Sequence, residues 1–321
     1  MKNILVVGGG GYIGGALVDM LLEGGHKVLV YDNLLYESEY RKPVDFVFGD
    51  VRDPSRMNPY LEWADVVVWL AAIVGDGACA ANPELAMEVN TKGVEWLAQS
   101  YDGRIIFTST CSVYGASDKV LDETSEVSPL SVYAVSKLQA ESHLLEKGGL
   151  IFRLGTLFGV GDNYARIRMD LVVNYLTARA LFSRHITVFG GDQYRPLLHV
   201  KDAARAIFMN LSTTHGGIFN LNAVNMPIRD LGEQLRLHFP DLKTEYTERK
   251  FQDNRNYRVS SEKALKTFGF IPNYTVDDGI CEIRALLESG RIKDVNNPRY
   301  SNSDSIRNWV GLWRSDSGMG R

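Results

Sequence analysis

A glycine cluster directly after an apolar run constrains this chain more than any other feature of its sequence. Residues 4–7 (ILVV) predict a buried parallel strand, and residues 16–22 (ALVDMLL) predict the helix that follows it. Between them, Gly8, Gly11 and Gly14 stand at three-residue spacing, which permits a tight turn, a close approach to a pyrophosphate and close packing of the helix. The start of that helix would also offer free N–H groups to phosphates. The dinucleotide contacts expected here are Gly8, Gly11, Tyr12, Ile13 and Gly14.

The second predicted strand ends in an acidic residue. Residues 27–31 (KVLVY) lead into Asp32 and Asn33, about twenty residues after the glycines, where a carboxylate accepts hydrogen bonds from the ribose hydroxyls of adenosine. The same charge would repel a 2′-phosphate, and no arginine immediately follows Asp32. We therefore expect NAD rather than NADP, with Asp32 and Asn33 among its contacts. The alternative interpretation of Asp32 is a turn residue after the strand.

The overall composition excludes several classes of protein. A chain of 321 residues is long enough for one large α/β domain and a smaller lobe. A net charge of −4 gives no reason to expect nucleic acid or a membrane as partner. Cys79, Cys111 and Cys281 lack metal-ligand spacing, so no metal is expected, and their odd number fits a reducing compartment. No signal peptide or membrane span is visible, so the expected location is the cytoplasm.

Strand and helix patterns alternate along the first half of the chain. Further strands are expected at residues 45–51, 65–72 and 104–110, and a helix over 82–101. Alternation of this kind is typical of a doubly wound parallel sheet in the α/β class, the Rossmann arrangement.

The ends of these predicted elements supply the remaining candidate cofactor contacts. Asp50, at the exit of the third strand, is expected to bind the adenine amino group or to cap the next helix. The small residues that end the fourth strand would let the cofactor pass close to the backbone. Asn90, within the predicted helix, would hold the cofactor or a catalytic water, or act as a packing amide. The contacts expected from these elements are Asp50, Val51, Leu70, Ala71, Ala72 and Asn90.

A tyrosine and a lysine four residues apart form the candidate catalytic pair. Tyr133 and Lys137 open a predicted amphipathic helix, and their spacing places both side chains on one face. An ammonium group beside a phenol and an oxidised nicotinamide favours phenolate and lowers the pKa of the tyrosine. Thr110, at the end of the fifth strand, can bond the same substrate oxygen. We expect these three residues to transfer a proton next to a hydride acceptor, with Tyr133 and Lys137 also contacting the cofactor.

Together these motifs resemble the extended short-chain dehydrogenases/reductases that act on nucleotide sugars, UDP-glucose 4-epimerase-like enzymes among them. The resemblance covers nearly the whole chain and implies that Thr110, Tyr133 and Lys137 form the family's catalytic triad. The matching segments are GGGGYIGG (8–15), YDNL (31–34), GDVRD (49–53), LAA (70–72), TSTCSVYG (108–115), YAVSK (133–137), RLGTLFGVG (153–161), VFGGDQYRPLLHVKDAARA (188–206) and NYRVSSEKA (256–264).

The resemblance also implies the organisation of the chain and its partners. An NAD-binding Rossmann domain is expected over residues 1–160, with returning segments near 186–225. Residues 161–321 would mainly form a smaller, interleaved lobe that grips a nucleoside-diphosphate sugar, followed by a C-terminal tail. A homodimer is implied as well.

Several residues of the second lobe match positions that hold the substrate in relatives. Arg195 matches a phosphate-contacting arginine, Lys250 stands where many relatives have a second one, and Asp253 is near the position of a ribose-binding carboxylate. Leu171 and Phe189 match the residues that sandwich the base, although both would also fit a core. The expected substrate contacts are Thr110, Cys111, Thr156, Leu171, Phe189, Arg195, Lys250 and Asp253.

Three reactions of the family differ at a few positions. The 4,6-dehydratases carry an Asp-Glu pair after the triad threonine, whereas this chain has Cys111 and Ser112, which disfavours dehydration. Enzymes that epimerise beside a 4-keto group, or reduce it, often place a cysteine one residue later, so a proton-shuttling Cys111 stays open beside a packing role. The simplest scheme is 4-epimerisation with retained NAD, and the alternative is an NAD(P)H-dependent reductase of a 4-keto sugar. A non-catalytic dinucleotide-binding scaffold is a third alternative, and the intact triad argues against it because a scaffold would not need these residues.

Other departures from the family concern the substrate. Thr156 replaces the asparagine of RxxN, and the loop over residues 163–170 differs from the usual UDP-hexose epimerase loop. Arg166 and Arg168 in that loop would face an acidic or bulky sugar, or else lie on the solvated surface. His199, between apolar neighbours, is expected to be buried for structural reasons.

Overall fold

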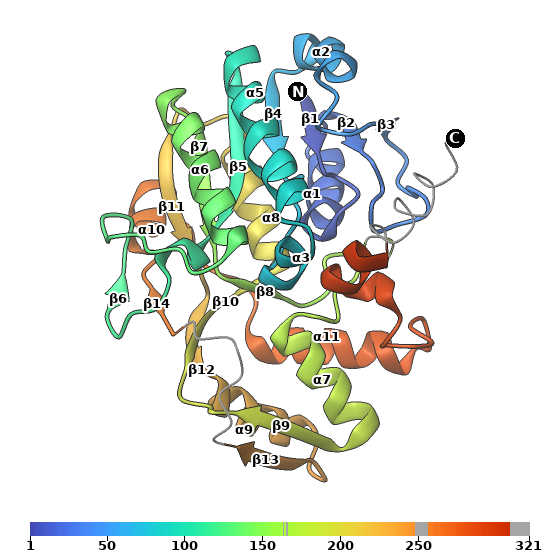
Figure 1. Ribbon diagram of the computed structural model, residues 1–321. Coiled ribbons are helices and arrows are strands. Elements are labelled where there is room, and N and C mark those ends of the chain that lie inside the picture. Colours follow the sequence, from blue (N-terminus) through green and yellow to red (C-terminus); the bar gives the residue numbers. More distant parts are fainter. Residues whose placement is uncertain (163, 165, 248–255, 309–321) are drawn as a thin grey trace, which may run out of the picture.

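A seven-stranded parallel sheet forms the centre of the molecule (Figure 1). The computed structural model describes residues 1–162, 164, 166–247 and 256–308. The strand order is β11-β7-β5-β4-β1-β2-β3, and all neighbours are parallel. This confirms the doubly wound sheet predicted from the sequence. The strands are β1 (Asn3–Val7), β2 (Lys27–Asp32), β3 (Asp45–Phe48), β4 (Val66–Trp69), β5 (Arg104–Thr110), β7 (Leu150–Leu154) and β11 (Gly217–Leu221).

Helices cover both faces of this sheet. Because successive side chains in a strand point to opposite faces, Leu5 and Val7 of β1 pack against one helical layer, and Ile4 and Val6 pack against the other. Burial on both faces explains why these strands are almost continuously apolar. The first layer contains α2 (Pro54–Trp63), α3 (Asp76–Ala81), α4 (Pro83–Met87), α5 (Gly93–Ser100) and α6 (Val132–Glu146), and the second contains α1 (Tyr12–Glu23), α8 (Val200–Met209) and α10 (Glu262–Phe268).

Some element boundaries differ from those predicted. The third and fourth strands end at Phe48 and Trp69, earlier than the apolar runs do, because the chain turns off the sheet at its carboxyl edge. At Gly49 a Cβ would lie 2.2 Å from the Tyr31 ring, so the turn needs a residue without a side chain. The helix expected over 82–101 is interrupted by a π-helical turn over Glu88–Lys92, which sequence periodicity did not indicate.

The smaller lobe lies in the lower part of Figure 1. Its apolar core includes Val188, Leu231 and Ile280. The chain enters this lobe after β7 and returns to the large sheet through α8 and β11, so the two lobes are interleaved. Its elements are β8 (Thr156–Phe158), α7 (Val172–Ser183), β9 (His185–Phe189), β10 (Tyr194–His199), β12 (Val224–Pro227), α9 (Ile228–His238), β13 (Lys243–Thr247) and α11 (Val276–Glu288); a separate pair joins β6 (Val120–Leu121) and β14 (Arg258–Val259).

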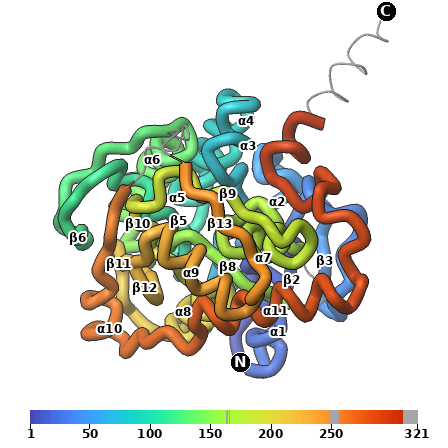
Figure 2. Tube along the Cα trace, turned by 90° about the horizontal axis from the view of Figure 1, so that it is seen from below, coloured from blue at the N-terminus to red at the C-terminus, as the bar shows by residue number. Residues whose placement is uncertain are grey.

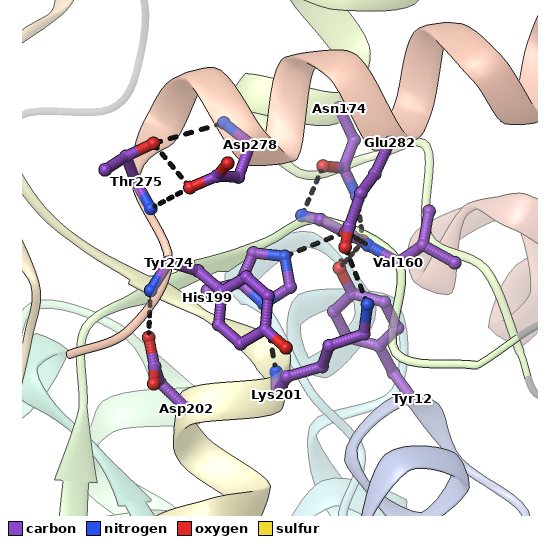
Figure 3. Close-up of polar contacts among 11 residues, drawn as sticks. Tyr12, Val160, Asn174, His199, Lys201, Asp202, Tyr274, Thr275, Asp278 and Glu282 are labelled. Atoms are coloured by element: carbon purple, nitrogen blue, oxygen red, sulfur yellow. Dashed lines mark hydrogen bonds and ion pairs between the residues drawn. The ribbon is translucent and has the colours of Figure 1, made fainter.

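A partly buried polar network connects the two lobes (Figure 3). Glu282 of α11 accepts hydrogen bonds from the backbone N–H of Val160 at 2.9 Å and from Lys201 Nζ at 2.6 Å. Its carboxylate also lies 2.9 Å from Nε2 of His199. His199 is fully buried and stacks on Tyr274 at 4.3 Å between ring centroids, which confirms the expectation that it is buried. Burial alone would raise the pKa of Glu282, but the bonds from His199 and Lys201 outweigh it and lower that pKa to about 2.

The C-terminal segment returns to the large sheet. Its last described residues lie on the side of β2 and β3 in both views (Figures 1 and 2). Ile306 is buried in the core beneath the first helical layer, and Arg299 pairs with Glu37. Trp309 and Trp313 of the tail lie outside the described residues. Of the helices that the structure describes, none has the length and apolar character needed to cross a membrane.

Candidate active site

The glycine turn joins β1 to α1 at the carboxyl edge of the sheet. Gly8 has φ +84°, and a Cβ there would lie 2.4 Å from the backbone nitrogen of Ala71, the second residue after β4. A Cβ on Gly14 would lie 2.3 Å from the carbonyl oxygen of Gly9. Both positions therefore require glycine. The strand order reverses between β1 and β4, which is where ligands bind in doubly wound sheets.

Asp32, the last residue of β2, lies beside the glycine turn. Its Oδ2 accepts the N–H of Gly10 at 2.9 Å, and its Oδ1 accepts the N–H of Leu34 at 2.7 Å. Burial raises the pKa of Asp32, and these two backbone bonds oppose the rise. Each carboxylate oxygen keeps a lone pair for a ribose hydroxyl. The turn role and the predicted ribose role are therefore compatible.

A cavity at this edge gathers most of the predicted cofactor contacts. It runs from the glycine turn along the ends of β2, β3 and β4. The close approach of Gly8 to Ala71 and the carboxylate of Asp32 suit a dinucleotide, so the residues present fit NAD. The predicted residues that line it are Gly8, Gly11, Tyr12, Ile13, Asp32, Asn33, Asp50, Val51, Leu70, Ala71 and Ala72.

Asp50 lines this cavity as one half of an ion pair. Arg52 bonds both of its carboxylate oxygens at 2.9 Å, and Asn33 Nδ2 donates to Oδ2 at 3.1 Å. Burial would raise the pKa of Asp50, but the bonds from Arg52 outweigh it and lower the pKa. The following helix, α2, is capped by Asp53 instead. The helix-capping interpretation of Asp50 was therefore wrong.

Asn90 belongs to the π-helical turn and is fully buried. Its Oδ1 accepts the N–H of Ile73 at 2.7 Å, and its Nδ2 donates to the carbonyl of Ile73 at 2.9 Å and to Ser136 Oγ at 3.0 Å. These bonds fix the segment after β4 against α6, next to Lys137. The packing alternative thus describes the contacts that Asn90 makes, and a direct cofactor contact stays a prediction.

The three candidate catalytic residues lie near the same edge. Thr110 is the last residue of β5, the neighbour of β4, and Tyr133 and Lys137 lie in the first turns of α6. Ser131 caps this helix, because its Oγ accepts a hydrogen bond from the N–H of Ala134 at 3.2 Å. The cap fixes the start of α6 and therefore the position of Tyr133 in its first turn. Tyr133 and Lys137 are 9% and 2% exposed, so water has little access to either.

Burial controls the protonation of this pair. Burial raises the pKa of Tyr133 above its ordinary value. The hydrogen bond with the Thr110 side chain lowers that pKa, but by less than burial raises it. Burial lowers the pKa of Lys137 to about 7. Lys137 Nζ lies 4.0 Å from the centroid of the Phe107 ring. The protein groups by themselves therefore do not produce the predicted lowering of the Tyr133 pKa. That prediction also included the positive nicotinamide, and it stays a prediction.

A buried ion pair that sequence reasoning missed lies next to Lys137. Glu141 accepts Arg153 Nη2 at 2.7 Å and Arg153 Nε at 3.0 Å, and Ser109 Oγ donates to it at 2.5 Å. Glu141 also counteracts the lowering of the Lys137 pKa. Its position four residues after Lys137, on the same face of the helix, was the signal that could have identified it.

The predicted substrate residues lie on other elements. Thr156 of β8 pairs in register with Leu197 of β10, and Arg195 lies two residues before Leu197 and donates to the Tyr194 carbonyl at 2.9 Å. The remaining candidates are Leu171 at the start of α7, Phe189 at the end of β9, and Lys250 and Asp253, which lie outside the described residues.

Cys111 is enclosed in a core cluster rather than in the cavity. It is fully buried among Val113, Tyr114 and Tyr257, and its Sγ lies 3.2 Å from the carbonyl oxygen of Arg153. Burial raises the pKa of this thiol, which opposes proton transfer near neutral pH. These contacts agree with a packing role for Cys111. They do not support a contact between Cys111 and the substrate.

Arg166 and Arg168 are both buried, so the solvated-surface interpretation was wrong. Both line the dinucleotide cavity. Arg168 forms two hydrogen bonds of 2.9 Å with Asp170. The loop therefore contributes to the cofactor cavity, and a contact between its arginines and the sugar stays a prediction. No cluster of three or more potential metal ligands occurs among the described residues.

Comparison with known sequences agrees with this geometry. The sequence model of the NAD dependent epimerase/dehydratase family matches residues 4–221. The chain belongs to this family. Its cofactor is accordingly NAD, which a structural neighbour also contains.

Relatives within the epimerase/dehydratase family are distant but cover most of the chain. A UDP-glucose 4-epimerase of Lacticaseibacillus casei is 27% identical, over 87% of this chain and 95% of that protein. A putative UDP-glucose 4-epimerase of Methanocaldococcus jannaschii is 26% identical, over 86% of this chain and 95% of that protein. The UDP-glucose 4-epimerase of Thermotoga maritima, solved with UDP-glucose, has a TM-score of 0.79 at 24% identity, over 89% of this chain and 99% of that one. MoeE5, solved with UDP-glucose and NAD, has a TM-score of 0.78 at 22% identity, over 90% of this chain and 99% of that one.

Proposed function

We propose that this protein is an NAD-dependent epimerase of a nucleoside-diphosphate sugar. It oxidises a sugar hydroxyl to a 4-keto group and reduces that group again on the opposite face, with NAD retained. The observation that carries the proposal is the position of Thr110, Tyr133 and Lys137 at the carboxyl edge where the dinucleotide cavity lies. The relatives named UDP-glucose 4-epimerase support the substrate class.

Each of the three side chains has a separate task in this scheme. NAD supplies a reversible hydride acceptor when bound. The Tyr133 phenolate takes the proton of the sugar hydroxyl, and the resulting phenol later returns that proton to the same oxygen. The Thr110 hydroxyl holds that oxygen in place. The Lys137 ammonium stabilises the phenolate, and the burial of all three residues keeps water from the keto sugar.

Two other reactions are less well supported. A 4,6-dehydratase needs an acid and a base after Thr110, whereas Cys111 is packed in the core and Ser112 Oγ lies 3.3 Å from the Tyr257 hydroxyl. An NAD(P)H-dependent reductase would use the same triad but would release its cofactor in every cycle. The carboxylate of Asp32 beside the ribose position argues against a 2′-phosphate.

A proton NMR time course tests the proposal. Purified protein is incubated with UDP-, GDP-, CDP- and dTDP-sugars without added cofactor. We expect a new anomeric signal from one of them. Turnover only with added NAD(P)H and a 4-keto sugar would contradict the proposal in favour of a reductase.

A pair of tyrosine variants tests whether Tyr133 transfers the proton. Tyr133→Phe keeps the ring in its core position and removes only the hydroxyl, so the rate should fall at least about 100-fold with bound NAD unchanged. Tyr175→Phe, at an exposed position on α7, is the matched control and should have the rate of the unmodified protein. Equal rates for both variants would exclude Tyr133 as the proton-transferring group.

A further inference from the structure

Three segments that no nucleotide motif predicted cover the dinucleotide cavity. They are the loop after β2, the segment over residues 166–170, and the C-terminal segment around Asn302. Tyr36, Arg166 and Asn302, one from each segment, line the cavity together with the glycine turn. We call these three residues the roof of the cavity.

Arg166 is the centre of the roof. It is 2% exposed, and its guanidinium carbon lies 3.6 Å from the centroid of the Tyr36 ring. Its Nη2 donates to Asn302 Oδ1 at 2.6 Å. Nε and Nη1 are also buried, and neither has a hydrogen-bond partner among the residues that the structure describes. Burial lowers the pKa of Arg166, but only to about 10, so the group is a cation at neutral pH.

A buried cation with two unsatisfied donors is unfavourable unless an anion reaches it. The acidic groups near it already have partners. Asp170 is bonded by Arg168, Glu37 pairs with Arg299, and Asp32 accepts two backbone N–H groups. The free N–H groups of Arg166 therefore suit an anion that enters with the ligand.

The position of Arg166 indicates which part of the ligand carries that anion. Arg166 shares the main cavity with Gly10 and Gly11, and it borders a second, smaller hollow with Gly9, Gly10 and Gly15. The start of α1 at this turn is where a dinucleotide places its phosphates. We propose that Arg166 binds the NAD pyrophosphate from the side opposite the glycine turn, as a phosphate contact supplied by the second lobe.

Asn302 is the positioning residue of this arrangement. Its side chain accepts Arg166 Nη2 and donates to the carbonyl of Val74 at 2.8 Å, and its backbone N–H donates to Asp170 at 3.0 Å. One residue of the C-terminal segment thus ties the arginine loop to the chain just beyond β4. This arrangement fixes the guanidinium before the ligand arrives.

A series of cofactor fragments tests the proposal without any measurement of turnover. The full chain, freed of bound nucleotide on charcoal, is titrated with adenosine, ADP, ADP-ribose and NAD, with weak ligands measured by competition. Arg166→Met keeps an apolar stem near Tyr36 but removes the charge. We expect ADP, ADP-ribose and NAD to bind about 10- to 100-fold more weakly, and adenosine to bind as before.

Within the Arg166→Met variant, the ratio of adenosine to ADP-ribose affinity separates this role from a folding defect. Arg166→Lys should recover part of the loss, and Asn302→Ala should give a smaller loss of the same pattern. Arg236→Met, on an exposed part of α9, should change nothing. An equal loss for adenosine and ADP-ribose, or no loss for either, would overturn the proposal.

Discussion

The two lobes differ in how their candidate site residues are brought together. In the large lobe, Gly8, Asp32 and Ala71 lie at or just after the carboxyl ends of β1, β2 and β4, which are neighbouring strands. The order of the sheet alone therefore places them around one cavity. In the smaller lobe, Arg195 lies on one small sheet and Phe189 on another. Their arrangement depends on how these sheets and their loops pack.

This difference separates cofactor binding from substrate choice. The cofactor site consists of local motifs on a rigid sheet, so it can change little without loss of the fold. Substrate residues on loops and small sheets can change without such a loss. The roof is the exception, since Arg166 comes from the second lobe but lines the cofactor cavity.

The largest effect is expected at the glycine turn. Gly8→Ala forces a Cβ to within 2.4 Å of the Ala71 backbone and strains a residue at φ +84°. NAD affinity should fall at least about 100-fold because the turn must move. Gly25→Ala is the matched control, since Gly25 also has positive φ (+71°) but no atom within 4 Å of its Cβ position. The control should cost about 1 kcal/mol of unfolding free energy and leave NAD binding intact; equal affinity losses would contradict this account.

The next effect concerns the buried ion pair between Glu141 of α6 and Arg153 of β7. Glu141→Ala leaves Arg153 buried without its carboxylate partner, so the free energy of unfolding should fall by about 3–5 kcal/mol. Urea denaturation of the variant measures this loss. Glu288→Ala breaks the exposed pair with Arg284 and should change stability by less than about 1 kcal/mol. A Glu141 variant as stable as this control would show that the pair does not support the large lobe.

An intermediate effect is expected where the lobes meet. Glu282→Gln weakens the network with His199 and Lys201, and stability should fall by about 1–3 kcal/mol. The folded-state pKa of Glu282 is lowered from 4.5 to about 2, so its contribution is complete above 4.5 and disappears as the pH falls towards 2. The stability gap between the unmodified chain and the variant should therefore narrow with falling pH in that range. A stability difference that does not change with pH would contradict the pairing of Glu282 with His199 and Lys201.

The smallest effect is expected at Cys111. Because its thiol is packed in the core cluster and its pKa is raised, Cys111→Ala should cost about 1 kcal/mol of stability and change turnover less than twofold. Cys281→Ala, at an exposed position, should change neither. A large loss of turnover in the Cys111 variant alone would restore the proton-shuttle interpretation.

The sequence predicted the large lobe better than the small one, for physical reasons. Apolar strands, the glycine cluster and the spacing of Tyr133 and Lys137 are local signals, and the structure has the strands and α6 at or near the predicted residues. The π-helical turn at Asn90 depends on bonds to Ile73 and Ser136, which are distant in sequence. The roof likewise forms between segments more than a hundred residues apart. Pattern reasoning has no access to such contacts.

The central claim is that the same hydride leaves and returns to one sugar carbon while NAD stays bound. We would incubate the purified chain, without added cofactor, with the active nucleotide sugar deuterated at C4 and follow both epimers by NMR and mass spectrometry. We expect an epimer that keeps the deuterium at C4. Loss of the label from the sugar, or turnover that requires added NAD(P)H, would contradict it.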